Sequence, residues 1–274
     1  NLNNMEVAID FGITNTDILV SNKAEKIYSS IPSEKINKDF LKKIFNTINL
    51  EPNKIKKIAV TGGKSDNLDN TFKDIPIFKV NEVQAIGMGA KDLYSINDEK
   101  FVVISAGTGT GCVFYDGENY HYLGGISIGG GTLQGLSNLL INTSDINKIE
   151  KLSNKGDRKI IDHLIGEVVN DIGPLNPNIT ASNFAKAKVI KDYSPEDIAA
   201  SLTNMVGEVI GTTSYLNAML VGVDKVYFLG RLSLLKTVKE AIDQRLKLAN
   251  IKGVYKENRE YGNLLGALGC IQTK

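Results

Sequence analysis

Two glycine-rich turns in this sequence carry residue types that bind phosphate groups. Gly107–Thr110 (GTGT) follows a short apolar run at 101–104, and Gly129–Gly131 (GGG) precedes a segment with leucines at helical spacing. Unpaired backbone N–H groups and a helix dipole at such turns attract anions. The two turns therefore predict a polyphosphate held between them. The alternative, in which the glycines only make hairpin turns, stays open at this point.

A third turn lies between the first two expected strands and contains a carboxylate. Asp10 ends the first strand, Gly12 makes the turn, and Thr14, Asn15 and Thr16 surround it. Hydroxyl and N–H groups bind oxyanions, and a carboxylate holds Mg²⁺ directly or through water. The pattern indicates a site for phosphate and magnesium, although a polar hairpin turn without chemistry has the same composition.

Composition is that of an ordinary globular protein. The chain of 274 residues is 42% hydrophobic and 23% charged, and its net charge of +1 gives no sign of a nucleic-acid or membrane-surface partner. The sequence shows neither an apolar stretch of membrane-spanning length nor a signal-peptide pattern. Cys112 and Cys270 lack metal-ligand spacing, which favours core packing and a reducing cytoplasm. Met5 is a candidate natural start, and whether Asn1–Asn4 are native stays open.

The elements that must position these turns form two α/β halves. The first half reads βββ-α-β-α-β-α, and the second is a variant of it. We expect strands at 6–12, 14–20, 25–30, 55–60, 75–80, 101–104, 113–115, 120–123, 226–229 and 253–255. We expect helices at 33–48 (capped by Ser33), 82–93, 132–140 (Leu133, Leu136, Leu139 and Leu140 on one face), 145–152 (capped by Ser144), 159–169, 195–220, 234–248 and 263–270. This organisation predicts two domains, 5–98 and 99–274, with a ligand cleft between them at the carboxyl ends of strands.

The three turns resemble motifs of the actin/hexokinase/Hsp70-type ATPases and kinases. Asp10-x-Gly12-x-Thr14 is similar to the first phosphate motif of that superfamily and Gly107–Thr110 to the second. Tyr227–Gly230 (YFLG) looks like its adenosine motif. The resemblance implies an α/β protein of two ribonuclease H-like domains, with mixed sheets and a central nucleotide cleft.

Within that superfamily the chain is most similar to the type II pantothenate kinases. The signature Gly-Gly-x-x-x-Gly-Gly-Gly-Thr at Gly124–Thr132 is the most specific match. Other similar segments are Ser105–Tyr115, Gly156–Arg158 with Asp162, Thr180–Phe184, Gly207–Val209 and Gly266–Gly269. The resemblance implies a dimeric kinase that uses ATP and Mg²⁺ to phosphorylate a primary alcohol, by default pantothenate.

The resemblance also implies roles for single residues. Glu82 is the expected base, because a carboxylate at a strand end facing the phosphates can accept the proton of the attacking hydroxyl. A Glu favoured only by the helix dipole is the alternative. Asp10 would position Mg²⁺. The expected nucleotide-binding residues are Gly12, Thr14, Asn15, Gly107, Thr108, Gly109, Thr110, Gly129, Gly130, Gly131 and Gly230. The expected substrate-binding residues are Glu82, Tyr122, Gly124, Gly125 and Arg158.

Two places depart from the family pattern. Tyr122 stands where the family generally has an Arg that engages the substrate carboxylate, and a tyrosine offers a hydrogen bond without charge. Ile13 and Asp17 stand where the first phosphate motif usually has a second Gly and a Lys. Two alternatives therefore stay open: a kinase of another small alcohol, and a nucleotide-binding regulator or activator ATPase with weak catalysis. The sequence leaves the acceptor alcohol, feedback by coenzyme A or its thioesters, and the dimer interface undetermined.

Overall fold

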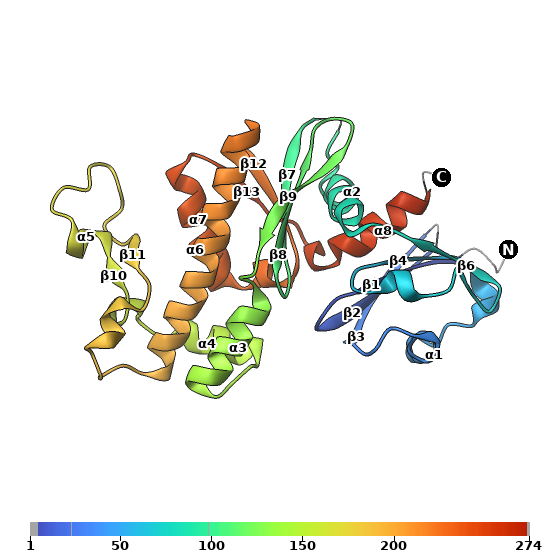
Figure 1. The fold of residues 1–274 in the computed structure, drawn as a ribbon, viewed down its shortest axis with the longest axis horizontal. Coiled ribbons are helices and arrows are strands. Elements are labelled where there is room, and N and C mark those ends of the chain that lie inside the picture. Colours follow the sequence, from blue (N-terminus) through green and yellow to red (C-terminus); the bar gives the residue numbers. More distant parts are fainter. Residues whose placement is uncertain (1–4, 23, 98, 273–274) are drawn as a thin grey trace.

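The computed structural model, which describes residues 5–22, 24–97 and 99–272, contains two mixed β-sheets (Figure 1). The first has the strand order β3-β2-β1-β4-β6-β5 and the second the order β13-β12-β7-β8-β9. In each, three antiparallel strands are followed by two parallel ones, and β5 adds an antiparallel edge strand to the first sheet. The orders 3-2-1-4-6 and 9-8-7-12-13 therefore correspond strand by strand, and the expected pair of ribonuclease H-like α/β units is confirmed. Asn1–Asn4 lie outside the described residues.

The elements have the following bounds. The strands of the first sheet are β1 (Met5–Phe11), β2 (Asn15–Ser21), β3 (Lys26–Pro32), β4 (Ile55–Thr61), β5 (Thr71–Phe72) and β6 (Ile75–Lys79). Those of the second are β7 (Phe101–Ala106), β8 (Thr110–Tyr115), β9 (Tyr120–Ile126), β12 (Lys225–Leu229) and β13 (Lys252–Val254), while β10 (His163–Leu164) and β11 (Thr180–Ser182) pair with each other. The helices are α1 (Lys38–Thr47), α2 (Glu82–Tyr94), α3 (Gly130–Ile141), α4 (Ile146–Ser153), α5 (Ile165–Val168), α6 (Pro195–Val221), α7 (Lys236–Leu248) and α8 (Gly262–Gln272).

Helices α2 and α8 join the two sheets (Figure 1). The carboxy-terminal α8 packs on β1 and β4 of the first sheet, whereas α2 packs on β7, β8 and β9 of the second. The two helices approach closely, since a Cβ on Gly266 would lie 1.7 Å from the carbonyl oxygen of Ala85. One hydrophobic core therefore contains residues of both sheets, such as Ala8 and Phe101. The expected division at residues 98–99 separates the sheets, while α8 packs with the first.

Local signals at both ends account for the long helix α6. The Ser194 hydroxyl accepts the N–H of Asp197, and the Asp197 carboxylate accepts the N–H of Ser194, which makes a capping box. Pro195 occupies the first helical position, and Gly222 ends the helix at φ 74°. The observed bounds agree closely with the range expected from the sequence.

The expected helix at 159–169 is wrong. Only a short 3₁₀ turn, the two-residue strand β10 and the four-residue α5 form there. Asp162 explains the break, because its fully buried carboxylate accepts the N–H of Phe184 and the hydroxyl of Ser201. These contacts hold the chain in a bent path, and residues 163–182 form a protrusion beyond α6 (Figure 1).

Three smaller expectations also need correction. Helix α1 starts at Lys38 with Asn37 as its cap, and α4 is capped by Asp145. Leu139 and Leu140 of α3 are 80% and 52% exposed, so the expected leucine face is only partly buried. Helical spacing alone does not distinguish a leucine that reaches the core from one beyond the edge of its neighbours.

Candidate active site

A cleft of about 1290 Å³ lies between the two halves, and most of the expected site residues line it. From the first half these are Asp10, Gly12, Thr14, Asn15 and Glu82. From the second half they are Gly107, Thr108, Gly109, Thr110, Tyr122, Gly125, Gly130 and Gly230. Gly124, Gly129, Gly131 and Arg158 are not among the lining residues. The turns that are far apart in sequence therefore converge on one cavity.

The turn at Gly12 is held by Ser33, which the sequence predicts to be a helix cap. The Ser33 hydroxyl donates to the carbonyl of Gly12 at 2.6 Å and lies 3.0 Å from the hydroxyl of Thr16, while the Ser33 N–H donates to the carbonyl of Thr14. The expected role of Ser33 as a helix cap is wrong because α1 begins five residues later. Ser33 instead fixes the loop that presents Thr14 to the cleft.

The turn at Gly107–Thr110 is hydrogen-bonded directly to the start of α3. The N–H of Gly130 donates to the carbonyl of Gly107 at 2.8 Å, and the N–H of Gly131 donates to that of Thr108 at 3.0 Å. The unpaired N–H groups expected at Gly130 and Gly131 are therefore already used. Within the described part of the chain, the N–H groups of Thr108 and Gly109 are the donors of this turn without a backbone acceptor. They are the ones left for an oxyanion.

The turn at Gly12–Thr14 and the turn at Gly107–Thr110 meet across the cleft. The hydroxyl oxygens of Thr14 and Thr108 are 3.0 Å apart, although the residues are 94 positions apart in sequence. Both side chains line the cavity. Hydroxyl groups from both halves are thus placed where one ligand can contact them together, as a bound polyphosphate requires.

Asp10 and Glu82 bring two carboxylates to the same end of the cleft. Asp10 lies at the end of β1, and Glu82 is the first residue of α2, whose N-terminus is capped by the Asn81 side chain. Loss of surrounding water, together with the charges of Asp17 and Glu82, raises the pKa of Asp10 to about 7; a hydrogen bond from Asn263 acts in the opposite direction. Such a carboxyl is suited to a cation, which would relieve the repulsion.

Gly230 forms the turn expected for an adenosine motif. Its φ of 93° suits glycine, and a Cβ there would lie 2.2 Å from the carbonyl oxygen of Ala106. Its N–H donates to the carbonyl of Arg259, and its carbonyl accepts the Ser233 hydroxyl. Beyond it the cleft is lined by apolar and amide side chains that can contact a base: Ile146, Asn147, Leu232, Leu234 and Leu235.

The sequence did not reveal the ion pair between Arg231 and Asp17. The guanidinium donates to both carboxylate oxygens at 2.7 and 2.6 Å, and Ser30 accepts a further bond at 3.3 Å. The pair links β2 of the first half to the turn after β12 of the second. Asp17 is 5% exposed, and it lies directly across the strand pair from Asp10. The signal that could have found it was the departure at Asp17, since a nearly buried carboxylate needs a cationic partner.

The Tyr122 side chain lies over Gly111 of the neighbouring strand β8 and over Gly125 of its own strand β9. A Cβ on Gly125 would be 2.5 Å from the Tyr122 hydroxyl oxygen, and one on Gly111 would be 3.7 Å from the ring. The side chain nevertheless remains 58% exposed along the cleft. Tyr122 can therefore meet a ligand with its ring or its hydroxyl.

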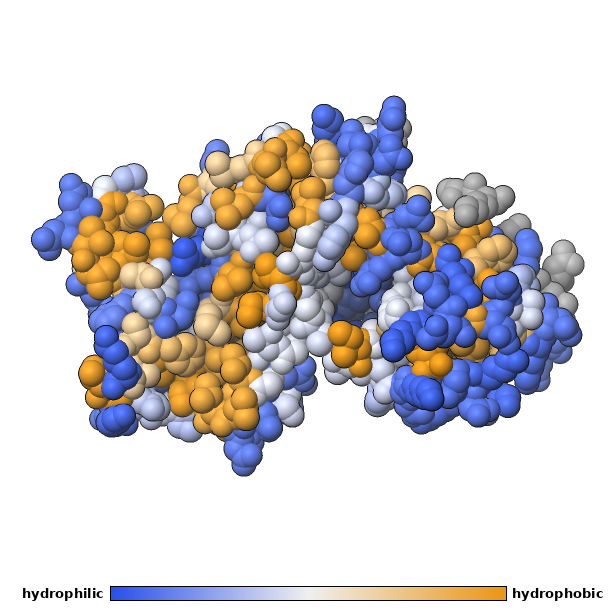
Figure 2. Space-filling view, viewed as in Figure 1, coloured by the Kyte–Doolittle hydropathy of each residue, from blue (hydrophilic) through white to orange (hydrophobic). Residues whose placement is uncertain are grey.

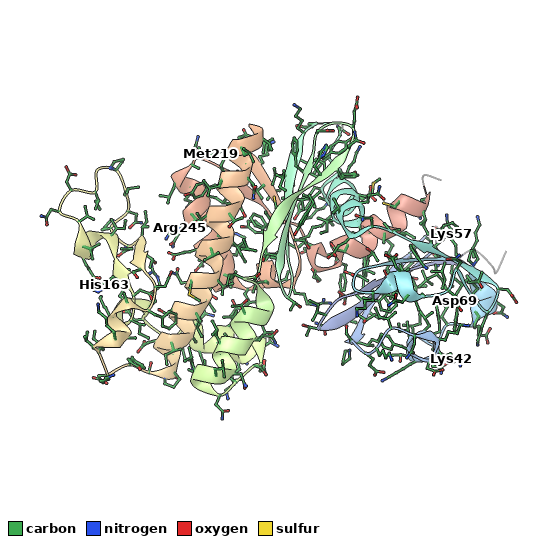
Figure 3. The ribbon with its side chains drawn as sticks, in the orientation of Figure 1. Lys42, Lys57, Asp69, His163, Met219 and Arg245 are labelled. Atoms are coloured by element: carbon green, nitrogen blue, oxygen red, sulfur yellow. The ribbon has the colours of Figure 1, made fainter. Side chains whose placement is uncertain are left out.

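Arg158 lies away from the cleft. Its guanidinium donates to the Thr180 hydroxyl at 2.7 Å and to the carbonyl of Asn178 at 2.6 Å, and it pairs with Asp162. It thus anchors the base of the protrusion, where Figure 3 labels His163, and α6 separates this region from the first sheet. Within one copy of the chain Arg158 therefore stabilises the base of the protrusion and does not reach the cavity.

Comparisons with known sequences identify close relatives. The sequence model of the Fumble family matches residues 14–271. A type II pantothenate kinase of Bacillus thuringiensis subsp. konkukian is 34% identical over an alignment of 237 residues that covers 82% of this chain and 82% of the relative. A type II pantothenate kinase of Staphylococcus haemolyticus is 29% identical over 271 residues, covering 96% of this chain and 99% of the relative.

Solved structures share the fold at low sequence identity. The activator of the 2-hydroxyisocaproyl-CoA dehydratase from Clostridium difficile, with bound ADPNP, superposes with a TM-score of 0.67 at 18% identity, covering 97% of this chain and 93% of the other. A ROK family glucokinase from Streptomyces griseus, in complex with glucose and AMPPNP, has a TM-score of 0.66 at 11% identity over 98% and 100% of the chains. Both likenesses concern the arrangement of the two sheets and their helices.

Proposed function

Because the chain belongs to the Fumble family of type II pantothenate kinases, we propose that it transfers the γ-phosphoryl group of ATP to the primary hydroxyl of pantothenate. The observation that carries the proposal is the position of Glu82 at the capped N-terminus of α2. It lies in the same cleft as the turns at Gly12–Thr14 and Gly107–Thr110, which would bind the phosphates. A carboxylate placed there can accept the hydroxyl proton as the alcohol attacks. Thr14, Thr108 and the N–H of Gly109 would hold the phosphates.

Asp10 is the residue that would hold Mg²⁺. Its carboxyl lies near Asp17 and Glu82, whose negative charges add to the effect of burial in raising its pKa to about 7, and this repulsion supports a cation at this place. Within the described residues, no three His, Cys, Asp or Glu side chains gather as a metal cage. This fits magnesium, which usually takes one or two carboxylates and completes its shell with water and substrate phosphates. The ion would neutralise phosphate charge.

A paired-acceptor assay tests this function. Release of ADP would be measured with pantothenate and with pantothenol, which has the same primary hydroxyl and no carboxylate. Turnover of pantothenate to a phosphorylated product supports the proposal. Turnover of neither compound, with nucleotide bound, would instead support a regulator ATPase.

A second candidate acceptor is a neutral alcohol, and Tyr122 is the observation that favours it. Arg231 is the one Lys, Arg or His that lines the cleft within the described residues, and Asp17 already neutralises it. A carboxylate that enters such a site meets little compensating charge. Equal kcat/KM for pantothenate and pantothenol would show that the acceptor carboxylate is not recognised.

We also propose that the chain forms a homodimer through the exposed face near the end of α6. Leu216, Met219 and Leu220 are 55%, 60% and 74% exposed there. Figure 2 shows hydrophobic surface over the end of α6 that carries Met219 in Figure 3. Apolar patches of this kind mark association surfaces. Light scattering of the wild type and of Met219→Glu would test the dimer, with a shift to the monomer mass expected for the variant.

A cytoplasmic location is the remaining part of the proposal. The helices of the described residues include none with the combination of length and apolar composition that a membrane span needs. The Cys112 thiol is buried and takes part in no disulfide. A reducing compartment would keep it so.

A further inference from the structure

The charges that line the cleft are unbalanced. Five carboxylate side chains line it, and within the described residues Arg231 is its single Lys, Arg or His. The five are Asp10, Asp17, Glu82, Glu150 and Glu260. A nucleotide polyphosphate brings further negative charge into this cavity. Any side-chain cation that contacts it must therefore be Arg231 or come from outside the described residues.

The guanidinium of Arg231 is held in one orientation. Asp17 binds it at two points, and the Arg231 Cζ lies 5.7 Å from the centre of the Tyr261 ring. Bidentate carboxylate pairing and an aromatic face together fix the plane of an arginine fork. Because Asp17 faces Asp10 across the β1–β2 pair, this plane lies beside the carboxyl that would hold magnesium.

Part of the fork remains free for a ligand. An arginine side chain has five N–H donors. Three bonds are formed, two to Asp17 and one to Ser30, and the side chain is still 37% exposed. Two donors are thus available on a group whose position is already fixed. A donor held in place loses less conformational freedom when the ligand binds.

Resting on the proposed ATP-dependent activity, we propose that Arg231 binds the phosphates of the nucleotide and that Asp17 is its positioning residue. The location favours phosphate over the acceptor carboxylate. Arg231 follows Gly230 at the end of β12, whereas Tyr122 lies on β9, three strands away in the order β12-β7-β8-β9. Asp17 also neutralises the guanidinium while the cleft is empty.

The test compares ADP with adenosine, which lacks phosphates, by calorimetric titration in Mg²⁺ and without any acceptor. Arg231→Gln should weaken ADP binding roughly tenfold to a hundredfold, the size of one charge-assisted hydrogen bond. Adenosine binding should change by about twofold or less, because the proposal places the guanidinium at the phosphates and not at the base or ribose. Lys247→Gln, the same charge change at an exposed position of α7, serves as the matched control.

A charge swap separates phosphate binding from a purely structural link between the halves. Arg231→Ser should lose the preference for ADP, and adding Asp17→Lys should restore it in large part, because the new ammonium occupies the place of the guanidinium. A structural link would instead be lost in both variants. Melting temperatures identify any variant that does not fold, in which case Arg231→Lys, which keeps the charge, replaces it.

Two results would overturn the inference. One is Arg231→Gln with an unchanged ratio of adenosine to ADP dissociation constants; the other is a variant in which only the KM for the acceptor rises, which would place the acceptor carboxylate at Arg231. Because these titrations contain no acceptor, failure of the proposed kinase reaction is detected separately. If the chain binds ADP through Arg231 but does not phosphorylate pantothenate, the proposed kinase activity is wrong and the inference about Arg231 still holds.

Discussion

The turn between β1 and β2 and the turn between β7 and β8 occupy equivalent places in the two sheets, but they carry different chemistry. In the first, Asp10 faces Asp17 across the strand pair; in the second, Ser105 faces Gly111 at the corresponding register. All four line the cleft. The turn between β1 and β2 therefore presents carboxylates to the cleft, which we propose serve the metal, whereas the turn between β7 and β8 presents neutral small residues, which would let phosphate approach the backbone. The same strand order thus carries two different polar environments, and substitutions at each turn test what it contributes.

The largest expected effect comes from the carboxylate at the start of α2. Glu82→Gln should lower kcat by ~10²–10⁴, the usual loss when a positioned base is removed. ATP affinity should stay within a few-fold, because the glutamine keeps the shape of the side chain. Steady-state ADP release and calorimetry measure the two quantities. Glu118→Gln, an exposed residue of the β8–β9 turn, is the matched control. A near-normal kcat would leave Glu82 only a role in starting the helix.

Charge can also be added to the neutral turn between β7 and β8. Gly111→Asp places a carboxylate opposite Ser105, and its Cβ would meet the Tyr122 ring at an ordinary 3.7 Å. We expect Mg·ADP affinity to fall by roughly tenfold or more, since a like charge within a few ångströms of phosphate costs a few kcal/mol at the effective dielectric of a protein surface. Gly111→Ala controls for the side chain itself and should bind nearly as well as the parent. If Gly111→Asp and Gly111→Ala bind Mg·ADP equally well, the lack of charge in the turn between β7 and β8 does not contribute to phosphate binding.

A positive charge can be added near the neutral turn, at Tyr122, to test acceptor recognition. Tyr122→Arg adds a cation beside the cleft, and charge-assisted bonds to a carboxylate are worth about 1.5–3 kcal/mol. Pantothenate kcat/KM should therefore rise roughly tenfold to a hundredfold, while that of pantothenol changes little. Efficient wild-type turnover of pantothenate at micromolar KM would contradict the idea that Tyr122 marks altered acceptor recognition.

These comparisons show which parts of the site can be predicted from sequence. The turns at Gly12 and Gly107 and the start of α2 were found because turn and cap chemistry is local. The contacts that hold them were not. Ser33 was interpreted as a helix cap, and the pairing of Asp17 with Arg231 spans 214 positions. Polar partners at such separations depend on how the two sheets face each other, which residue spacing does not encode.

In the fold, too, local sequence predicts some features and tertiary contacts decide others. The positions of most strands and the bounds of α6 follow from apolar patterning, capping and helix-ending residues. The order of the strands in each sheet depends on tertiary pairing, and the break after Arg158 depends on a carboxylate that is buried only after folding. The crossing of α2 and α8 likewise requires glycines whose small size matters only against a distant helix. Local rules thus locate the elements, and the tertiary contacts decide where some of them end.

The smallest expected effect concerns the ionisation of Asp10. Its pKa is raised to about 7, so the proton is bound more tightly in the folded chain than in the unfolded one. In the ligand-free protein this contribution to stability is fully present below about pH 4 and is lost as the pH rises through 7. If Asp10 holds Mg²⁺ as proposed, Mg·ADP binds the ionised carboxylate, and its affinity should increase about tenfold between pH 6 and 8 for one titrating group.

The two pH dependences therefore have opposite signs, which distinguishes Asp10 from groups that only stabilise the fold. Asp10→Asn should remove the part of each slope that belongs to this carboxyl, and the slope that remains in the affinity reports the titration of the nucleotide itself. Chemical denaturation without ligand and calorimetry with Mg·ADP, each at several pH values, measure both quantities on the same protein. If the variant keeps the parent's affinity profile, the Asp10 carboxylate does not bind the metal, and the metal-binding role would pass to Asp17 or Glu82, the neighbouring carboxylates of the same half.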